Sequence, residues 1–100
     1  MPIPTMIQLK RDRVIHELAG STGPGRIVSP QHFRECLHKA LDVWPGRPDE
    51  FKIHCADEFA VSSATLDRWM QGKSAPTMSV RIYVLDRLRR FLTDANHGRT

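Results

Sequence analysis

Apolar residues recur every three or four positions over most of the chain, which is the spacing of one face of an α-helix. The clearest stripe consists of Phe33, Cys36, Leu37, Ala40 and Leu41. A second stripe, near the C-terminus, consists of Val80, Val84, Leu85, Leu88, Phe91 and Leu92. Residues 6–19 have a weaker helical pattern, although the segments MIQL and RVI would also suit short strands. The sequence therefore predicts an all-α fold of about five helices.

Local signals mark the ends of several of these helices. Ser29 supplies a capping hydroxyl and Pro30 suits the first helical position, so a helix is predicted to begin there and to continue to about residue 43. Trp44 begins a loop rich in proline and glycine, and we expect its ring to fold onto the core. The last helix is predicted to start at either Thr77 or Ser79.

Two short helices joined by a tight turn are predicted in the middle of the chain. The first covers roughly residues 51–59, the turn is 60–62, and the second covers 63–71. Ser62 is placed to cap the second helix, and Gly72 to end it in a left-handed conformation. At about 100° per residue, the inner side of the second helix carries Ser62, Leu66, Trp69 and Met70. Its outer side carries Ala64, Asp67, Arg68 and Gln71.

This segment resembles the helix-turn-helix of the phage repressor/Cro (XRE) family. The matching residues are Cys55-Ala56, Phe59-Ala60-Val61-Ser62, Thr65-Leu66, Arg68-Trp69, Gly72-Lys73 and Pro76. One position departs from the family pattern, because Ala60 stands where glycine is usual. Alanine is less favourable than glycine at that position if its φ angle is positive. The resemblance implies a lambda-repressor-like fold with the helix-turn-helix at its centre.

The resemblance also implies a function, namely sequence-specific binding of double-stranded DNA by a transcriptional regulator, in particular a repressor. The second helix of the motif would lie in the major groove. The residues expected to face bases or nearby phosphates are Ser63, Ala64, Asp67, Arg68 and Gln71. The residues expected to hold the DNA backbone are Lys52, Ser62, Thr65 and Lys73.

Within this set, Arg68 and Gln71 are expected to choose the bases. Arginine presents two parallel donors to guanine, and glutamine presents a donor and an acceptor to adenine. Asp67 is the exception, because an acid close to phosphates costs free energy. We expect its carboxylate either to accept from a cytosine amino group or to pair with Arg68 or Gln71.

The expected partners follow from the same resemblance. Repressor-like modules commonly bind palindromic sites as two-fold dimers, so we expect a homodimer on a palindromic operator. The candidate dimer contacts are the N-terminal segment and the last helix, with Phe91 and Leu92. An alternative hypothesis is a protein-interaction module, such as an antitoxin whose N-terminal segment binds a toxin. For the arginines of the last helix, a phosphate-binding patch and an ordinary solvated face both remain open; these are Arg81, Arg87, Arg89 and Arg90.

The chain divides into an arm, helix and linker (1–28), a helix-turn-helix domain (29–95) and a frayed tail (96–100). The first segment is expected to dock on the domain or to help pair two subunits.

The formal net charge is +4, and the second half of the chain carries eight Lys and Arg against five Asp and Glu. This excess favours a polyanionic partner. The N-terminus lacks a signal-peptide pattern and no apolar run is long enough to span a membrane, so a cytoplasmic protein is expected.

Other candidate chemistry in the sequence is weak. Gly20 and Gly25 have the spacing of a phosphate-binding loop, but Arg26 stands where that loop needs lysine. Several histidines and cysteines lie at helical positions without forming a CxxC or HxxxH pair: His32, Cys36, His38, His54 and Cys55. A metal site or a catalytic Cys–His pair is therefore not expected. We expect no cofactor, no metal and no enzymatic activity.

Overall fold

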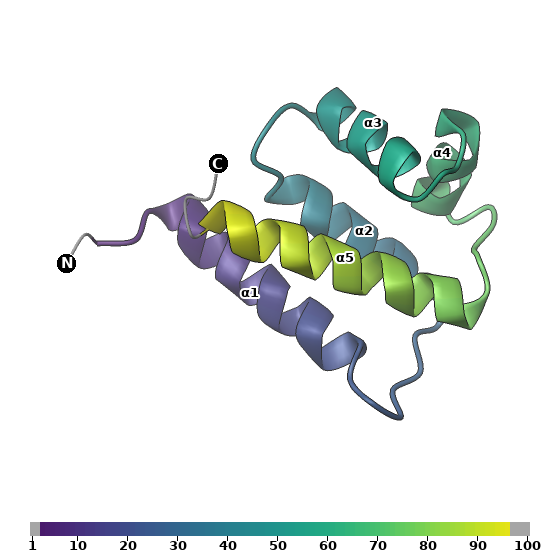
Figure 1. Ribbon diagram of the computed structural model, residues 1–100, viewed down its shortest axis with the longest axis horizontal. Coiled ribbons are helices and arrows are strands. Elements are labelled where there is room, and N and C mark those ends of the chain that lie inside the picture. The colour runs from purple at the N-terminus through teal and green to yellow at the C-terminus, as the bar shows by residue number, and fades with distance from the viewer. Residues whose placement is uncertain (1–2, 97–100) are drawn as a thin grey trace.

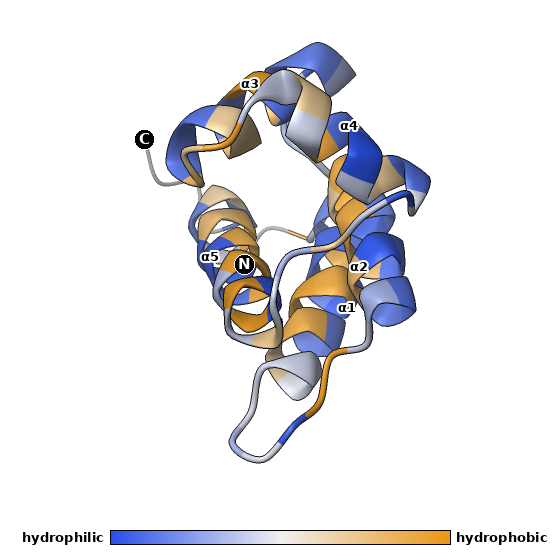
Figure 2. Ribbon diagram, turned by 90° about the vertical axis from the view of Figure 1, so that its right-hand side faces the viewer, coloured by the Kyte–Doolittle hydropathy of each residue, from blue (hydrophilic) through white to orange (hydrophobic). Residues whose placement is uncertain are grey.

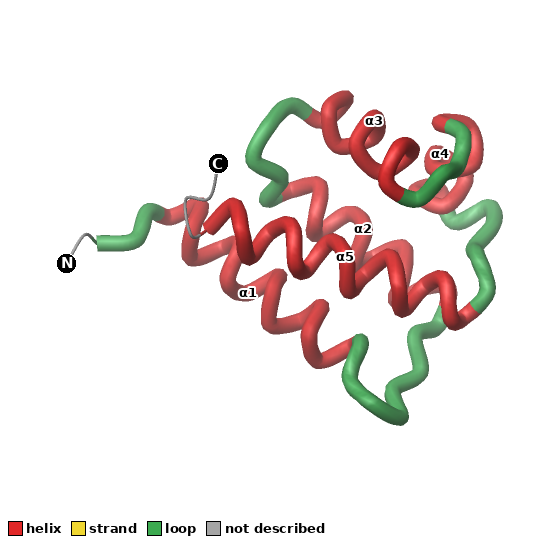
Figure 3. Tube along the Cα trace, in the orientation of Figure 1, coloured by secondary structure: helices red, strands yellow, loops and turns green. Residues whose placement is uncertain are grey.

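The structure is a computed structural model that describes residues 3–96, and within that range helices joined by loops make up the whole fold (Figure 3). In chain order the helices described are α1 (Met6–Ser21), α2 (Pro30–Asp42), α3 (Pro48–Glu58), α4 (Ser63–Gln71) and α5 (Met78–Asn96). The predicted all-α fold is thus confirmed. The alternative of short strands near the N-terminus is wrong, because both segments lie within α1.

The long helix α5 lies at the centre of the arrangement (Figure 1). α1 packs along α5 in the opposite direction, so that the start of α1 lies beside the end of α5. α2 packs against both of these helices, α4 packs on α2, and α3 packs on α4. The side-chain amide of Asn96 donates to the carbonyl of Gln8 at 2.9 Å and to the carboxylate of Asp12 at 2.8 Å. These bonds fix the end of α5 to α1.

All five helices contribute to one hydrophobic core, and their apolar faces turn toward one another (Figure 2). The largest side chains that are fully buried are Phe33, Phe51, Leu18, Leu37, Leu66, Leu85, Leu88 and Leu92. Full burial of a side chain of this kind contributes roughly 1.5–3 kcal/mol. Val14 and Leu18 of α1 belong to this core. The N-terminal helix therefore docks on the helices that follow it.

Most of the predicted helix ends are confirmed. Ser29 accepts the backbone N–H of His32 at 3.1 Å, and α2 begins at the next residue. α5 begins at Met78, between the two predicted positions. It includes Asn96, the first residue assigned to the tail, and the rest of that tail lies outside the described residues. Residues 1–2 of the expected arm lie outside them as well.

The start of α1 carries a cap that sequence reasoning missed. Thr5 and Gln8 form a capping box, in which each backbone N–H donates to the other side chain, at 2.8 and 3.2 Å. Two orphan donors of the first turn are satisfied in this way. At its other end, α1 continues to Ser21, so Gly20 is helical and the connector to α2 is shorter than predicted.

The loop between α2 and α3 is held to the core by aromatic contacts. Trp44 stacks on Phe91, with ring centroids 4.4 Å apart and planes at 11°, and meets Phe51 edge-on at 5.0 Å. The expectation that Trp44 folds onto the core is confirmed. The choice of Leu92 as a dimer contact is wrong, because Leu92 is fully buried within the chain. Phe91 is half-buried and stacks on Trp44, and its role as a dimer contact stays a prediction. Val80, which was predicted to belong to the apolar stripe of the last helix, is 39% exposed and lies outside the core.

Across residues 3–96, the structure contains no helix with the length and apolar character needed to cross a membrane.

Candidate nucleic-acid interface

The turn between α3 and α4 is fixed by backbone hydrogen bonds. The N–H of Val61 donates to the carbonyl of Ala56 at 3.0 Å, and that of Ala60 to the carbonyl of Asp57 at 3.3 Å. This pair of bonds is the Schellman ending, which needs a left-handed residue just after the helix. Ala60 is that residue, with a φ of +54°, and no other non-glycine residue described has a positive φ. Ala60, which stands where the resembling family usually has glycine, therefore adopts a conformation that costs free energy for alanine.

α4 begins and ends as the sequence predicts. Ser62 accepts the N–H of Thr65 at 3.1 Å and donates its hydroxyl to Thr65 Oγ1 at 3.0 Å. At the other end Gly72 is left-handed, with a φ of +76°, and the N–H of Lys73 donates to the carbonyl of Arg68 at 2.9 Å. Ser62 itself is exposed at the helix start, so its predicted place on the inner side is wrong.

The inner face of α4 fixes the rotation of the helix about its axis. Leu66, Trp69 and Met70 are buried, and Trp69 meets Phe33 of α2 edge-on with centroids 5.7 Å apart. The Nε2 of His38 on α2 donates to the carbonyl of Met70 at 2.7 Å. These contacts leave the opposite face of α4 outside the core.

Four of the predicted contact residues on α4 are exposed, and these are Ser63, Ala64, Arg68 and Gln71. Ala64, Arg68 and Gln71 lie within about 60° of one another around the helix, on the side opposite the buried residues. Ser63 lies at the start of the helix, and Thr65 is half-buried at its flank, beside the capping hydroxyl. Lys73 is exposed just beyond the helix. Ala64, Arg68 and Gln71 thus form the outer face of α4, and Ser63, Thr65 and Lys73 lie around it.

Asp67 has a partner that sequence reasoning did not identify. Its carboxylate lies 2.9 Å from the Nζ of Lys52 on α3, and both side chains are nearly half exposed. The expected pairing with Arg68 or Gln71 is therefore wrong. An ion pair of this exposure contributes at most about 1 kcal/mol to stability. Its larger consequence is that the one acid on α4 is neutralised, while Lys52 is already engaged by that acid.

Unpaired positive charge gathers at the C-terminal end of α4. Within residues 3–96, the side chains of Arg34, Arg68 and Lys73 make no hydrogen bond or ion pair. Arg34 comes from α2, and its stem lies against Gly72. The remaining unpaired cations described lie on α1 and the loop after it, and these are Lys10, Arg13 and Arg26.

Sequence reasoning missed Arg34 because it assigned α2 only to the core. A signal was present, since Gln31, Arg34 and His38 are spaced i, i+3 and i+7 and form a polar stripe beside the apolar one. The spacing alone does not say what this stripe faces. The fold supplies that information by placing it against the end of α4.

The arginines of α5 are engaged within the protein. Arg87 lies 2.6 Å from Glu58 of α3, and this carboxylate raises the pKa of the guanidinium. Arg89 and Arg90 both pair with Asp86, at 2.9 and 3.1 Å. Arg81 donates to the carbonyls of Val28 and Pro76. For Arg87, Arg89 and Arg90 the structure supports structural and solvated contacts rather than a free phosphate-binding patch, whereas the partners of Arg81 are neutral.

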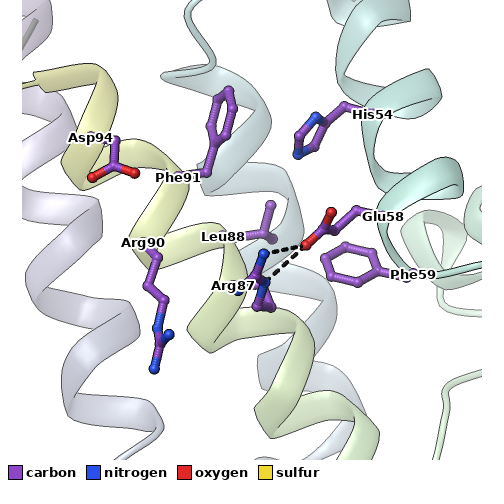
Figure 4. Close-up of a pocket in the computed structure, with 8 residues that line it drawn as sticks. All are labelled: His54, Glu58, Phe59, Arg87, Leu88, Arg90, Phe91 and Asp94. Carbon is purple, nitrogen blue, oxygen red and sulfur yellow. Dashed lines mark hydrogen bonds and ion pairs between the residues drawn. The ribbon is translucent and has the colours of Figure 1, made fainter. Parts of the chain in front are cut away.

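A cleft of about 320 Å³ opens between α3 and α5 (Figure 4). Its apolar lining comes from Phe59, Leu88 and Phe91, and the Glu58–Arg87 pair closes one side of it. The ring of His54 lies 4.6 Å from that of Phe91. The charges of the Glu58–Arg87 pair cancel, and the remaining charged lining residues, Arg90 and Asp94, are of opposite sign.

The two cysteines are free and buried, Cys36 on α2 and Cys55 on α3. Burial raises the pKa of the Cys36 thiol to about 11 and that of Cys55 to about 12. Both thiols therefore stay protonated at neutral pH, which disfavours metal binding and nucleophilic chemistry. His32 lies 3.5 Å from Cys36 but is shared with the hydroxyl of Ser21 at 2.7 Å. Among the described residues, no three potential metal ligands come together.

Comparisons with protein-family models, with curated proteins and with solved structures find no match to this chain.

Proposed function

We propose that this protein binds double-stranded DNA in a sequence-specific manner and acts as a transcriptional repressor of the helix-turn-helix type. In this proposal α4 enters the major groove, and α3 lies across the groove behind it. The all-helical fold is compatible with this role. The surface of α4 supports it more directly.

The observation that carries the proposal is that α4 is fixed on one side and unoccupied on the other. Its buried side is held by Leu66, Trp69 and Met70, so the helix presents a defined set of outward side chains. Of these, Arg68 and Gln71 have fork-shaped polar groups that match guanine and adenine edges. Ala64, one turn before Arg68 on the same side of the helix, is small, which permits close approach to the bases.

The charge around α4 supports a polyanionic partner. Arg68 and Lys73 have no partner among the described side chains, whereas the arginines of α5 are engaged elsewhere. Asp67, which would repel a phosphate, is neutralised by Lys52. Lys73 and the exposed hydroxyl of Ser63 would hold the DNA backbone, and the outer face of α4 would choose the sequence.

We further propose that two copies bind a palindromic operator. The surface available for pairing is the N-terminal end, where Ile3 is 90% exposed, Met6 72% and Leu9 46%. Met6 and Leu9 lie one turn apart on α1, and Ile3 lies in the segment just before the helix. Large exposed apolar side chains grouped in this way are unusual for a surface without a partner. Of the dimer contacts predicted from the sequence, this proposal keeps the N-terminal segment and drops the buried Leu92.

The proposal is tested by selecting bound sequences from a random duplex library. We expect a single enriched motif with two-fold symmetry. Enrichment without symmetry would contradict the dimer, and no enrichment at low salt would contradict DNA binding itself. The variant Arg68→Ala, run in parallel, should lose preference at one base pair of each half-site.

The exposed N-terminal residues Ile3, Met6 and Leu9 also favour the second candidate function, a protein-interaction module such as an antitoxin. In that case a different protein covers them. Purification of the untagged protein from its native cells, followed by mass spectrometry, separates the two candidates. A stoichiometric second protein that is lost in the variant Met6→Ser/Leu9→Ser would favour the interaction module.

A further inference from the structure

A groove of about 450 Å³ lies between the first turn of α2 and the loop that follows α4. The lining residues relevant here are Gln31, Arg34, Gly72, Ser74 and Arg81. Its volume falls in the range of small-ligand sites, roughly 300–1,000 Å³. The groove is therefore larger than one ion requires and has room for a phosphate together with the sugar beside it.

The groove is positively charged and contains no carboxylate among its lining residues. Arg34 has no hydrogen bond or ion pair with any described residue, so its guanidinium is available to a ligand. Arg81 donates to two backbone carbonyls, which are neutral and leave its charge uncancelled. Arginine forks match the geometry of phosphate oxygens, and bonds of this kind are about twice as strong as neutral hydrogen bonds.

The groove adjoins the end of α4. A Cβ on Gly72 would lie 3.0 Å from the Cδ of Arg34, so the glycine allows the arginine stem to rest on the helix end. The nine residues of α4 extend about 14 Å, and the major groove of DNA is about 12 Å wide. A helix of that length in that groove has both ends close to sugar–phosphate strands. The strand at the C-terminal end would pass over Lys73 and the groove.

We propose that this groove receives a phosphodiester of the DNA strand that passes the C-terminal end of α4. Arg34 is its charged, bidentate donor, and the Gln31 amide and Ser74 hydroxyl are its neutral donors. The proposal rests on the proposed DNA binding of α4, and adds α2 as a second element that grips the backbone. Arg81 holds the floor of the groove through the carbonyls of Val28 and Pro76.

The test compares Arg34→Gln with the matched control Arg90→Gln, which removes the same charge from an exposed arginine of α5 paired with Asp86. Affinity for a random duplex is measured from 50 to 300 mM salt. Loss of one phosphate contact should make the log–log slope shallower by about 0.9 and weaken binding roughly eightfold at 0.1 M salt. Arg34→Lys should restore part of the slope. Ser74→Glu, which places a carboxylate in the groove, should bind more weakly than the wild-type protein.

Equal slopes for Arg34→Gln and Arg90→Gln in a protein that binds DNA would overturn the groove proposal and leave the proposed function intact. If the wild-type protein binds no duplex, titration with inorganic phosphate followed by amide NMR shows whether the groove binds an anion at all. Saturable shifts at Gln31 and Ser74 that vanish in Arg34→Gln would show an anion site for a free phosphate, and would refute its assignment to a DNA strand. An absence of shifts would refute the site altogether.

Discussion

The two helices of the motif end in the same backbone arrangement, with alanine at one end and glycine at the other. Ala60 and Gly72 are both left-handed, with φ angles of +54° and +76°. A residue with a side chain loses roughly 1–2 kcal/mol of stability in this conformation. Glycine avoids that strain, but it gives the unfolded chain more conformational entropy, which lowers stability by about 0.4–1 kcal/mol. Ala60→Gly should therefore stabilise the protein by roughly 0.5–1 kcal/mol, and Gly72→Ala should destabilise it by at least as much.

For a domain of about 100 residues, 1 kcal/mol moves the melting temperature by roughly 4–8 °C. Thermal unfolding followed by circular dichroism is thus sensitive enough to detect both changes. Gly20→Ala provides the control, because Gly20 is helical and an added Cβ meets nothing within 4 Å. This control should stabilise α1 by about 1 kcal/mol. A lower melting temperature for Ala60→Gly would show that Ala60 is not left-handed and that the turn has been described wrongly.

Three further predictions concern packing, the thiols and the ion pair. Leu66→Ala should destabilise the protein by roughly 2–5 kcal/mol while Gln71→Ala changes stability by less than about 0.5 kcal/mol, and similar melting temperatures for the two would refute the rotation of α4. Because burial raises the pKa of Cys36 to about 11, its thiol stays protonated in the folded protein after it ionises in the unfolded chain. Cys36 should therefore contribute a fall in the free energy of unfolding of up to about 1.4 kcal/mol per pH unit between about pH 9 and 11, in addition to the fall from Cys55. Urea titrations of Cys36→Ala should show a shallower fall than those of the wild-type protein. Asp67→Asn should free Lys52 and tighten binding to a random duplex, and unchanged affinity would show that the pair does not face DNA.

Sequence reasoning found those parts of the fold that depend on neighbouring residues. Ser29 and Ser62 cap the helices that follow them, and Gly72 ends α4, because each signal acts within one turn of its own helix. The buried positions of α4 were also predictable, since Leu66 and Trp69 share a face by spacing alone. The outer face of α4 followed from the same spacing.

The parts that were missed depend on which helices meet. Asp67 pairs with Lys52 rather than with a neighbour on α4, because α3 places the lysine 2.9 Å away. Leu92 of α5 is fully buried, and α1 packs along this helix. The weak apolar stripe of α1 did not reveal that packing. Arg34 reaches the end of α4 only because α2 crosses there. Periodicity assigns a residue to a face of its helix, but it does not identify the neighbour of that face.

The most direct test of the central claim is the affinity of Arg68→Ala for two duplexes at one fixed salt concentration. One duplex carries the selected site and the other is random. If Arg68 contacts a base, the variant should lose roughly 1–3 kcal/mol on the selected site and clearly less on the random duplex, where only a generic charge is removed. The control Arg90→Ala should change both affinities little. Equal losses of Arg68→Ala on the two duplexes would contradict base recognition by the outer face of α4.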